Sequence, residues 1–301
     1  RHTLRGSVWM GFEKDWGDDF TSGFRITSTQ GGATSTDFLV DNYFQEQPVG
    51  IDRAFIDWHP RWAVDNPFIK DFRIVAGKFA NPLTSTGMLW DSDVQPEGVY
   101  EKIVFQHEDW GGFEPYATFA QLIASEIAFS DDVTCQAWQL GFDWRFDKDV
   151  TWEFAATYYD WDGFEDAINR DFDFGGNFLD APFGLNAANL AGNVFPRGAR
   201  ATTLFGNTIS VNPRDGQVYY DVGDFDLINI YNSVTFNVAW GEKRIPVKPF
   251  FDIVWNEAEA NEVFAGAARL GRRNYNDGHT VGVVVGSLKK KGDWQALYNY
   301  G

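Results

Sequence analysis

The segment from Val133 to Trp161 reads VTCQAWQLGFDWRF-DKD-VTWEFAATYYDW, two alternating stretches joined by the turn Asp147-Lys148-Asp149. Side chains of a β-strand point alternately to its two faces, so residues two apart share a face. One face of the first stretch is apolar and holds Trp138, Leu140, Phe142, Trp144 and Phe146. The other is polar or small and holds Gln139, Gly141, Asp143 and Arg145. This pattern predicts a β-hairpin with one apolar and one polar face.

The length of these stretches favours a membrane setting. Each runs for about 12–14 residues, enough for a tilted strand to cross a bilayer, whereas strands of soluble proteins usually have about 5–6. Trp and Tyr stand near the strand ends, as in the aromatic girdles of membrane β-barrels. A soluble sheet that packs one face on a core would show the same alternation. The hairpin alone therefore leaves both alternatives open.

Composition excludes several classes of protein. The chain has 301 residues, 17% aromatic residues, a formal charge of −18 and a mean hydropathy of −0.33. Such a share of aromatic residues is foreign to disordered chains. The longest apolar run, Val281–Gly286, is too short for a membrane helix, but the alternation of a β-barrel hides its lipid face from such a scan. The acidic balance argues against a nucleic-acid partner.

Strand-like stretches recur along the whole chain, without a linker or a short repeat. We expect about twelve strands in a single all-β domain over residues 1–301. The expected ranges are Leu4–Phe12, Thr21–Thr29, Ile51–His59, Phe72–Ala80, Tyr100–Glu108, Glu114–Ser125, Val133–Phe146, Val150–Trp161, Phe225–Trp240, Pro246–Ala258, His279–Lys289 and Asp293–Tyr300.

The connections alternate in length. Short turns follow the odd-numbered strands, whereas longer segments follow most even-numbered ones, namely Gln30–Gly50, Asn81–Val99, Asp162–Gly223 and Glu259–Gly278. Short turns on one rim and long loops on the other are typical of a transmembrane antiparallel β-barrel of the outer membrane. Because such barrels keep both chain ends at the short-turn rim, we expect further strands at both ends and roughly 14–18 strands in the intact barrel.

The polar faces of the expected strands supply candidate pore-lining residues. Isolated in lipid, such groups would each cost several kcal/mol, whereas groups that face a channel stay hydrated and shape its electric field. Cross-strand pairing within the wall is the alternative role for any one of them. The candidates are Arg53, Asp57, Arg73, Lys102, Gln106, Gln139, Asp143, Arg145, Glu153, Lys248, Asp252 and Asn256.

The segment Asp162–Gly223 is the longest irregular insertion. Long loops in compact domains are usually functional or disordered. One hypothesis is that it folds into the barrel as a constriction loop; the alternatives are an extracellular cap or a subunit contact. The stretches Thr202–Val211 and Gln217–Val222 could add a hairpin. The charged candidates for a constriction are Asp166, Arg170, Asp171, Asp173, Arg197, Arg200 and Arg214.

No motif indicates catalysis, a cofactor or a metal. The sequence lacks a nucleophile elbow, a phosphate-binding loop, a paired-His metal motif and a haem attachment site. The single cysteine, Cys135, excludes an internal disulfide framework. The acid cluster Asp160–Asp166 lacks the full spacing of a calcium loop. We interpret Trp90–Asp93 as a loop that packs its Trp.

Two stretches carry a family resemblance: Ile51-Asp-Arg-Ala-Phe-Ile-Asp-Trp-His-Pro60, and Gly77-Lys-Phe-Ala-Asn-Pro82 running on to Leu89–Gly98. Together with Gly23–Ile26 they resemble the "putative porin" family of Gram-negative outer membranes, most clearly in the N-terminal third. The resemblance implies an outer-membrane β-barrel with a diffusion channel, assembled as a homotrimer. It implies neither a particular solute nor a mapped binding residue.

Pattern and resemblance together predict a porin of the bacterial outer membrane that passively conducts ions and small hydrophilic solutes. Its partners would be membrane lipid and further copies of the chain, and it would not be an enzyme. One alternative is a secreted all-β carbohydrate-binding module, in which the aromatic faces would line a core. Another is a barrel that acts as a sheath or anchor for partner proteins.

Overall fold

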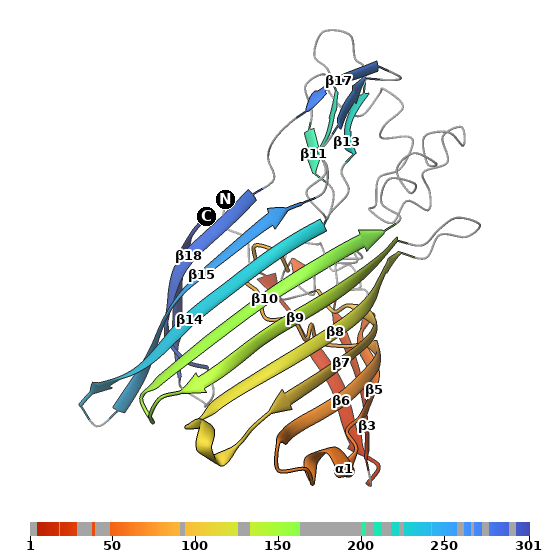
Figure 1. Cartoon of the computed structure of the whole chain (residues 1–301). Helices are drawn as coiled ribbons and strands as arrows, with labels where there is room; N and C mark the ends of the chain where they lie inside the picture. The colour runs from red at the N-terminus through yellow and green to blue at the C-terminus, as the bar shows by residue number, and fades with distance from the viewer. Residues whose placement is uncertain are drawn as a thin grey trace.

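A computed structural model describes residues 5–17, 19–28, 38–39, 49–90, 94–125, 133–162, 200–202, 208–211, 218–222, 226–241, 243–257, 262–265, 268–272, 277–288 and 293–301. Its main element is a 12-stranded sheet in the order β19-β18-β15-β14-β10-β9-β8-β7-β6-β5-β3-β2. All neighbours in it are antiparallel, and the sheet curves around a concave side (Figure 1).

The bounds of these strands match the expected ranges closely, except that the first strand begins later than expected. They are β2 (Trp9–Asp15), β3 (Phe20–Ser28), β5 (Val49–Trp58), β6 (Ile69–Lys78), β7 (Glu97–Phe105), β8 (Phe113–Ser125), β9 (Val133–Arg145), β10 (Val150–Asp162), β14 (Asp226–Trp240), β15 (Lys243–Asn256), β18 (Asp277–Gly286) and β19 (Gln295–Tyr300). The twelve-strand prediction is therefore confirmed, and the larger count for an intact barrel stays a prediction.

The remaining elements are short. A two-stranded sheet pairs β1 (Arg5–Gly6) with β4 (Phe38–Leu39), and single turns form α1 (Arg61–Val64) and η1 (Glu108–Trp110). A separate five-stranded sheet contains β11 (Arg200–Thr202), β12 (Thr208–Val211), β13 (Val218–Val222), β16 (Glu262–Ala265) and β17 (Ala268–Arg272). The extra hairpin predicted in this region is present as β12 and β13, but it leaves the strand count of the main sheet unchanged.

Within the described part of the chain, no helix is both long and apolar enough to cross a membrane.

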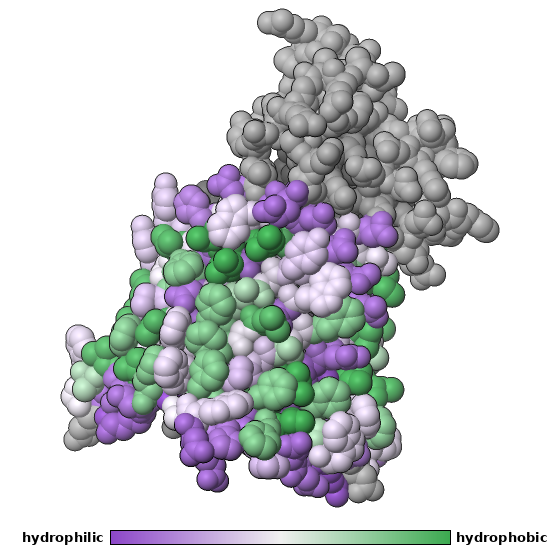
Figure 2. All heavy atoms as spheres, in the orientation of Figure 1, coloured by the Kyte–Doolittle hydropathy of each residue, from purple (hydrophilic) through white to green (hydrophobic). Residues whose placement is uncertain are grey.

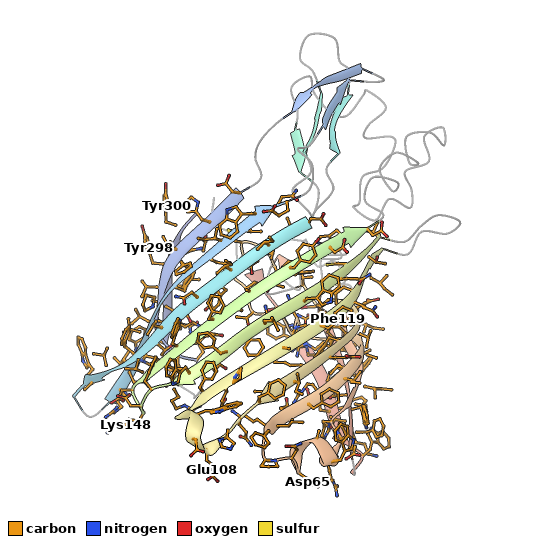
Figure 3. The ribbon with its side chains drawn as sticks, viewed as in Figure 1. Asp65, Glu108, Phe119, Lys148, Tyr298 and Tyr300 are labelled. Carbon is orange, nitrogen blue, oxygen red and sulfur yellow. The ribbon has the colours of Figure 1, made fainter. Side chains whose placement is uncertain are left out.

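The short turns lie together at one end of the sheet. Figure 3 labels Asp65, Glu108 and Lys148 in three of them. In the β9–β10 turn, the Asp147 carboxylate accepts hydrogen bonds from the backbone N–H groups of Asp149 (2.6 Å) and Val150 (2.9 Å). This local bonding satisfies the turn and explains how so short a link folds a hairpin.

The convex face of the sheet is apolar and exposed. Leu140 is 67% exposed, and Trp138 and Tyr158 are each 39% exposed. In Figure 2, apolar residues cover the middle of the visible face and polar residues gather towards its ends. An apolar surface of this extent is rare on soluble proteins and is what a lipid-facing wall requires. A soluble carbohydrate-binding module would instead bury these aromatic residues.

The hydrophobic core lies on the opposite, concave face. Side chains from several neighbouring strands pack there against the connection between β6 and β7, to which Phe79, Leu83, Leu89 and Trp90 belong. The sheet residues of this cluster include Val75, Tyr100, Ala120, Leu122, Val133, Cys135, Ala137, Tyr159 and Trp161. The molecule therefore packs its core on the concave side of the sheet, beneath one connecting segment.

Candidate functional site: a charged inner wall and an inward-folded loop

The connection between β6 and β7, residues 79–96, crosses the concave face of the sheet; we call it the inner loop. Met88 reaches as far as β18, where a Cβ atom on Gly278 would lie 3.6 Å from the Met88 Sδ atom. The loop then returns, and Arg53 Nε donates a hydrogen bond to the Gln95 side-chain oxygen at 2.9 Å. Residues 91–93 lie outside the described part of the chain.

Two buried polar side chains of the sheet hold the inner loop. Gln139, 1% exposed, accepts a hydrogen bond from Thr84 N (3.0 Å) and donates one to Thr84 O (3.1 Å). Asp252, 0% exposed, accepts a hydrogen bond from Thr86 N at 2.7 Å. Buried polar groups need such partners, so the loop and the sheet complete each other's hydrogen bonding.

Tyr116 supports the same part of the loop. Its hydroxyl group donates to Thr84 Oγ1 at 3.2 Å. The ring passes over Gly141, where an added Cβ atom would lie 2.4 Å from the Tyr116 Cζ atom. Any side chain at this position would therefore displace the Tyr116 ring.

Trp90 packs the returning arm of the loop against β10. Its ring centroid lies 6.3 Å from that of Tyr159 and 6.1 Å from that of Trp161. The prediction that this loop packs its Trp is confirmed. Together with the apolar cluster, the contact fills the space between the returning arm and the sheet.

Nearer the short turns, the concave face carries fixed charges of both signs. Arg73 contacts Asp57 (3.4 Å) and Asp71 (3.0 Å), and Lys248 contacts Glu153 at 2.8 Å. Lys70 pairs with Glu114. These pairs neutralise part of the charge on the wall.

Asp143 stands at the centre of an acidic row. The register places it opposite Glu114 of β8 and opposite Glu153 of β10. Like charges directly opposite one another repel, which favours a nearby cation. Lys102 Nζ lies 4.8 Å from the centroid of the Tyr116 ring. Within the described residues, neither Asp143 nor Lys102 forms a salt bridge.

The register places the candidate wall residues on one face, the face that carries the inner loop. This holds for Arg53, Asp57, Arg73, Lys102, Gln139, Asp143, Arg145, Glu153, Lys248, Asp252 and Asn256. Gln106 follows β7 in a short turn. Arg145 and Asn256 lie near opposite ends of the sheet, and Gln139 and Asp252 are buried under the loop rather than hydrated. That these residues line a pore stays a prediction.

The candidate constriction residues of the long insertion cannot be compared with the structure. Asp166, Arg170, Asp171, Asp173, Arg197 and Arg214 lie outside the described residues, and for Arg200, the first residue of β11, the backbone alone is described. The segment found on the concave face is instead the shorter inner loop, which sequence reasoning did not single out as folding inward. Its apolar residues, Leu83, Leu89 and Trp90, are the signal that could have indicated it.

The chain is similar to a solved structure of OmpT of Vibrio cholerae lacking loop L8, with 12% identity, 99% of this chain and 91% of that chain covered, and a TM-score of 0.37. It is also similar to a structure of OmpF of Salmonella typhi in complex with daunomycin, with 11% identity, 99% of this chain and 91% of that chain covered, and a TM-score of 0.35. These likenesses are too distant to carry details over. No curated protein matches the sequence.

A family model described as "Putative porin" matches residues 1–301, the full length of the chain. This match confirms the resemblance drawn from the N-terminal stretches, and the sheet with its lipid-facing convex side agrees with it. The chain belongs to the putative porin family and is an outer-membrane porin of the bacterial cell envelope.

Proposed function

We propose that this porin is a passive diffusion channel for ions and small hydrophilic solutes, with no chemical step. The observation that carries the proposal is the inner loop, held across a concave wall that bears charges of both signs. A pore of this kind selects by radius and by electrostatics.

The solute path would run along the charged part of the wall. On one side of the inner loop, the apolar cluster around Trp90 and Tyr159 fills the space. On the other, Lys102, Asp143 and Glu153 keep part of their surface accessible. Solutes would pass between the loop and this wall, where size and charge act together.

The wall supports a mild preference for cations. Its acidic row, Glu114, Asp143 and Glu153, spans three neighbouring strands, and its central member forms no salt bridge within the described residues. A negative field in a narrow passage raises the local concentration of cations. The acidic formal charge of the chain, −18, acts in the same direction.

We further propose that residues 1–301 belong to one barrel domain, that the long insertion 162–223 is a loop of it, and that the porin assembles as a homotrimer. The sheet order, in which sequential strands of one wall are neighbours, supports a single domain. The family resemblance supports the trimer. Light scattering of the detergent-solubilised protein would measure its mass, and a monomer would contradict the trimer.

Single-channel recording of the intact protein in a planar bilayer, under a salt gradient, tests the function. Stepwise insertions with a stable conductance are expected, with a reversal potential on the cation-selective side. Insertion without current would favour a barrel filled by a partner protein. A protein that is soluble without detergent and does not insert would contradict the channel altogether.

A further inference from the structure

Residues Thr84 to Thr86 connect two strands that are not neighbours. Thr84 is bonded to Gln139 of β9, and Thr86 is bonded to Asp252 of β15, with β10 and β14 between them. Three steps along a flat sheet amount to about 14 Å, since neighbouring strands lie about 4.8 Å apart. Two residue steps of extended chain span about 7 Å. The sheet therefore curves around this segment, and the two side chains converge on it.

Both contacts join a side chain of the sheet to the backbone of the loop. Gln139 bonds the N–H and the C=O group of Thr84 and also donates to Thr157 Oγ1 at 2.7 Å. Asp252 accepts from the Thr86 N–H group with one oxygen and from the Asn229 amide with the other. Because backbone groups are the partners, the contacts fix the height of the chain above the wall.

We propose that Gln139 and Asp252 are positioning residues that set the aperture of the channel, by binding the inner loop to two strands of the concave wall, β9 and β15. The inference rests on the proposed channel function. Tyr116 also holds Thr84 from β8, and Trp90 and Gln95 hold the returning arm of the loop. Among the hydrogen bonds of the described residues, only the one from Thr86 to Asp252 joins the segment before Met88 to β15. Loss of either tie lets this segment rise from the wall, which widens the passage.

The test compares four variants of the full chain in planar bilayers. Asp252→Ala and Gln139→Ala each remove one tie. Asp252→Asn removes the charge but keeps an acceptor oxygen for Thr86. Its new amide can donate to Asn229 if the Asn229 side-chain amide turns, which brings Asn229 Oδ1, without a hydrogen-bond partner among the described residues, to face it. Gln136→Ala changes the same residue type on the same strand, β9, at an exposed position of the convex face.

The two readouts are single-channel conductance and the largest neutral polyethylene glycol that enters the pore, which senses size independently of charge. We expect Asp252→Ala and Gln139→Ala to raise the conductance about 1.5-fold or more and to admit larger polymers, since conduction follows pore diameter. Asp252→Asn and Gln136→Ala are expected to keep the polymer cut-off of the parent protein.

The inference is wrong if both alanine variants conduct and exclude the same polymer sizes as the parent protein. It is also wrong if Asp252→Asn widens the pore as far as Asp252→Ala does. A parent protein that inserts but carries no current would instead contradict the channel function. Should either alanine variant fail to assemble, Thr86→Pro supplies the test from the loop side. It removes the N–H group that donates to Asp252 and leaves every strand unchanged. If this variant excluded the same polymer sizes as the parent protein, the inference would equally be wrong.

Discussion

The two faces of the same strands have opposite relations between polarity and burial. On β9, Trp138 and Leu140 are apolar and exposed, whereas Gln139 between them is polar and 1% exposed. A soluble sheet with a solvated face shows the reverse. The convex face is stable because lipid replaces water there. The concave face is stabilised where buried polar groups such as Gln139 and Asp252 find partners in the loop or on a neighbouring strand.

The two faces also differ in how their surfaces are covered. The convex face needs no specific partner, since lipid tails cover any apolar side chain equally well. The concave face depends on particular geometry: Gly141 makes room for Tyr116, and Tyr116 reaches Thr84. Substitutions on the convex face should therefore destabilise the barrel when they change polarity, and substitutions on the concave face should do so when they change shape.

The largest expected effect is a charge introduced on the convex face. Leu140→Arg should destabilise the barrel by about 2–4 kcal/mol, because an exposed basic residue near the bilayer midplane has no aqueous partner. The measurement is folding into lipid vesicles, followed by the gel shift between folded and heated protein. Asp143→Arg, on the concave face three residues away, is the control and should fold and insert. Equal folding of both variants would mean that the faces are assigned wrongly.

A change of shape on the concave face should have the next largest effect. Gly141→Val should destabilise the folded barrel by about 1–3 kcal/mol, in the range of overpacked cores. An added Cβ atom meets the Tyr116 ring and, at 2.5 Å, the backbone oxygen of Phe154. The midpoint of urea unfolding in vesicles measures the effect. Gly87→Ala, where a Cβ atom meets nothing within 4 Å, is the matched control and should leave the midpoint unchanged.

The sequence carries the strands and their faces but only part of the site. Period-two alternation identifies Gln139 and Asp143 as facing away from Trp138 and Leu140, because each residue's own neighbours define its face. What Gln139 touches depends on Thr84, 55 positions away along the chain, and no local pattern encodes that distance. The length of the insertion 162–223 predicts a constriction there, whereas the inward fold of the shorter inner loop is indicated only by its apolar residues.

The acidic row of Glu114, Asp143 and Glu153 also could not be predicted from local alternation alone. Glu153 was a candidate wall residue by alternation, whereas Glu114 was not, although the two flank Asp143. Pairing between strands, and hence the row itself, follows from the register, which alternation within one strand does not fix.

Glu101 is an exception on the convex face that sharpens the comparison. In the described part of the 12-stranded sheet, it is the one outward-facing charge more than two residues from a strand end, between Ile74 and Phe119 on the neighbouring strands. Glu101→Leu should stabilise the barrel by about 1 kcal/mol, since an acidic group facing lipid costs less than a basic one but still costs. Urea unfolding in vesicles measures the change, with Ile103→Leu on the same face as control. A loss of stability, or of an oligomer, would show that this carboxylate contacts another subunit.

The smallest expected effect compares the loss of one negative charge on each face. Asp143→Asn removes the central member of the acidic row and should lower the cation-to-anion permeability ratio by a factor of about 1.5–2, because the field in the passage weakens. Glu101→Gln makes the same change of charge on the convex face, where the sheet and the lipid separate it from the solute path. The reversal potential under a salt gradient measures both, and only the first variant should shift it towards anions. High salt should reduce the shift, since screening shortens the reach of a fixed charge. If both variants moved the reversal potential equally, the preference would arise from the total charge of the protein, and the concave wall would lose its part in selecting ions.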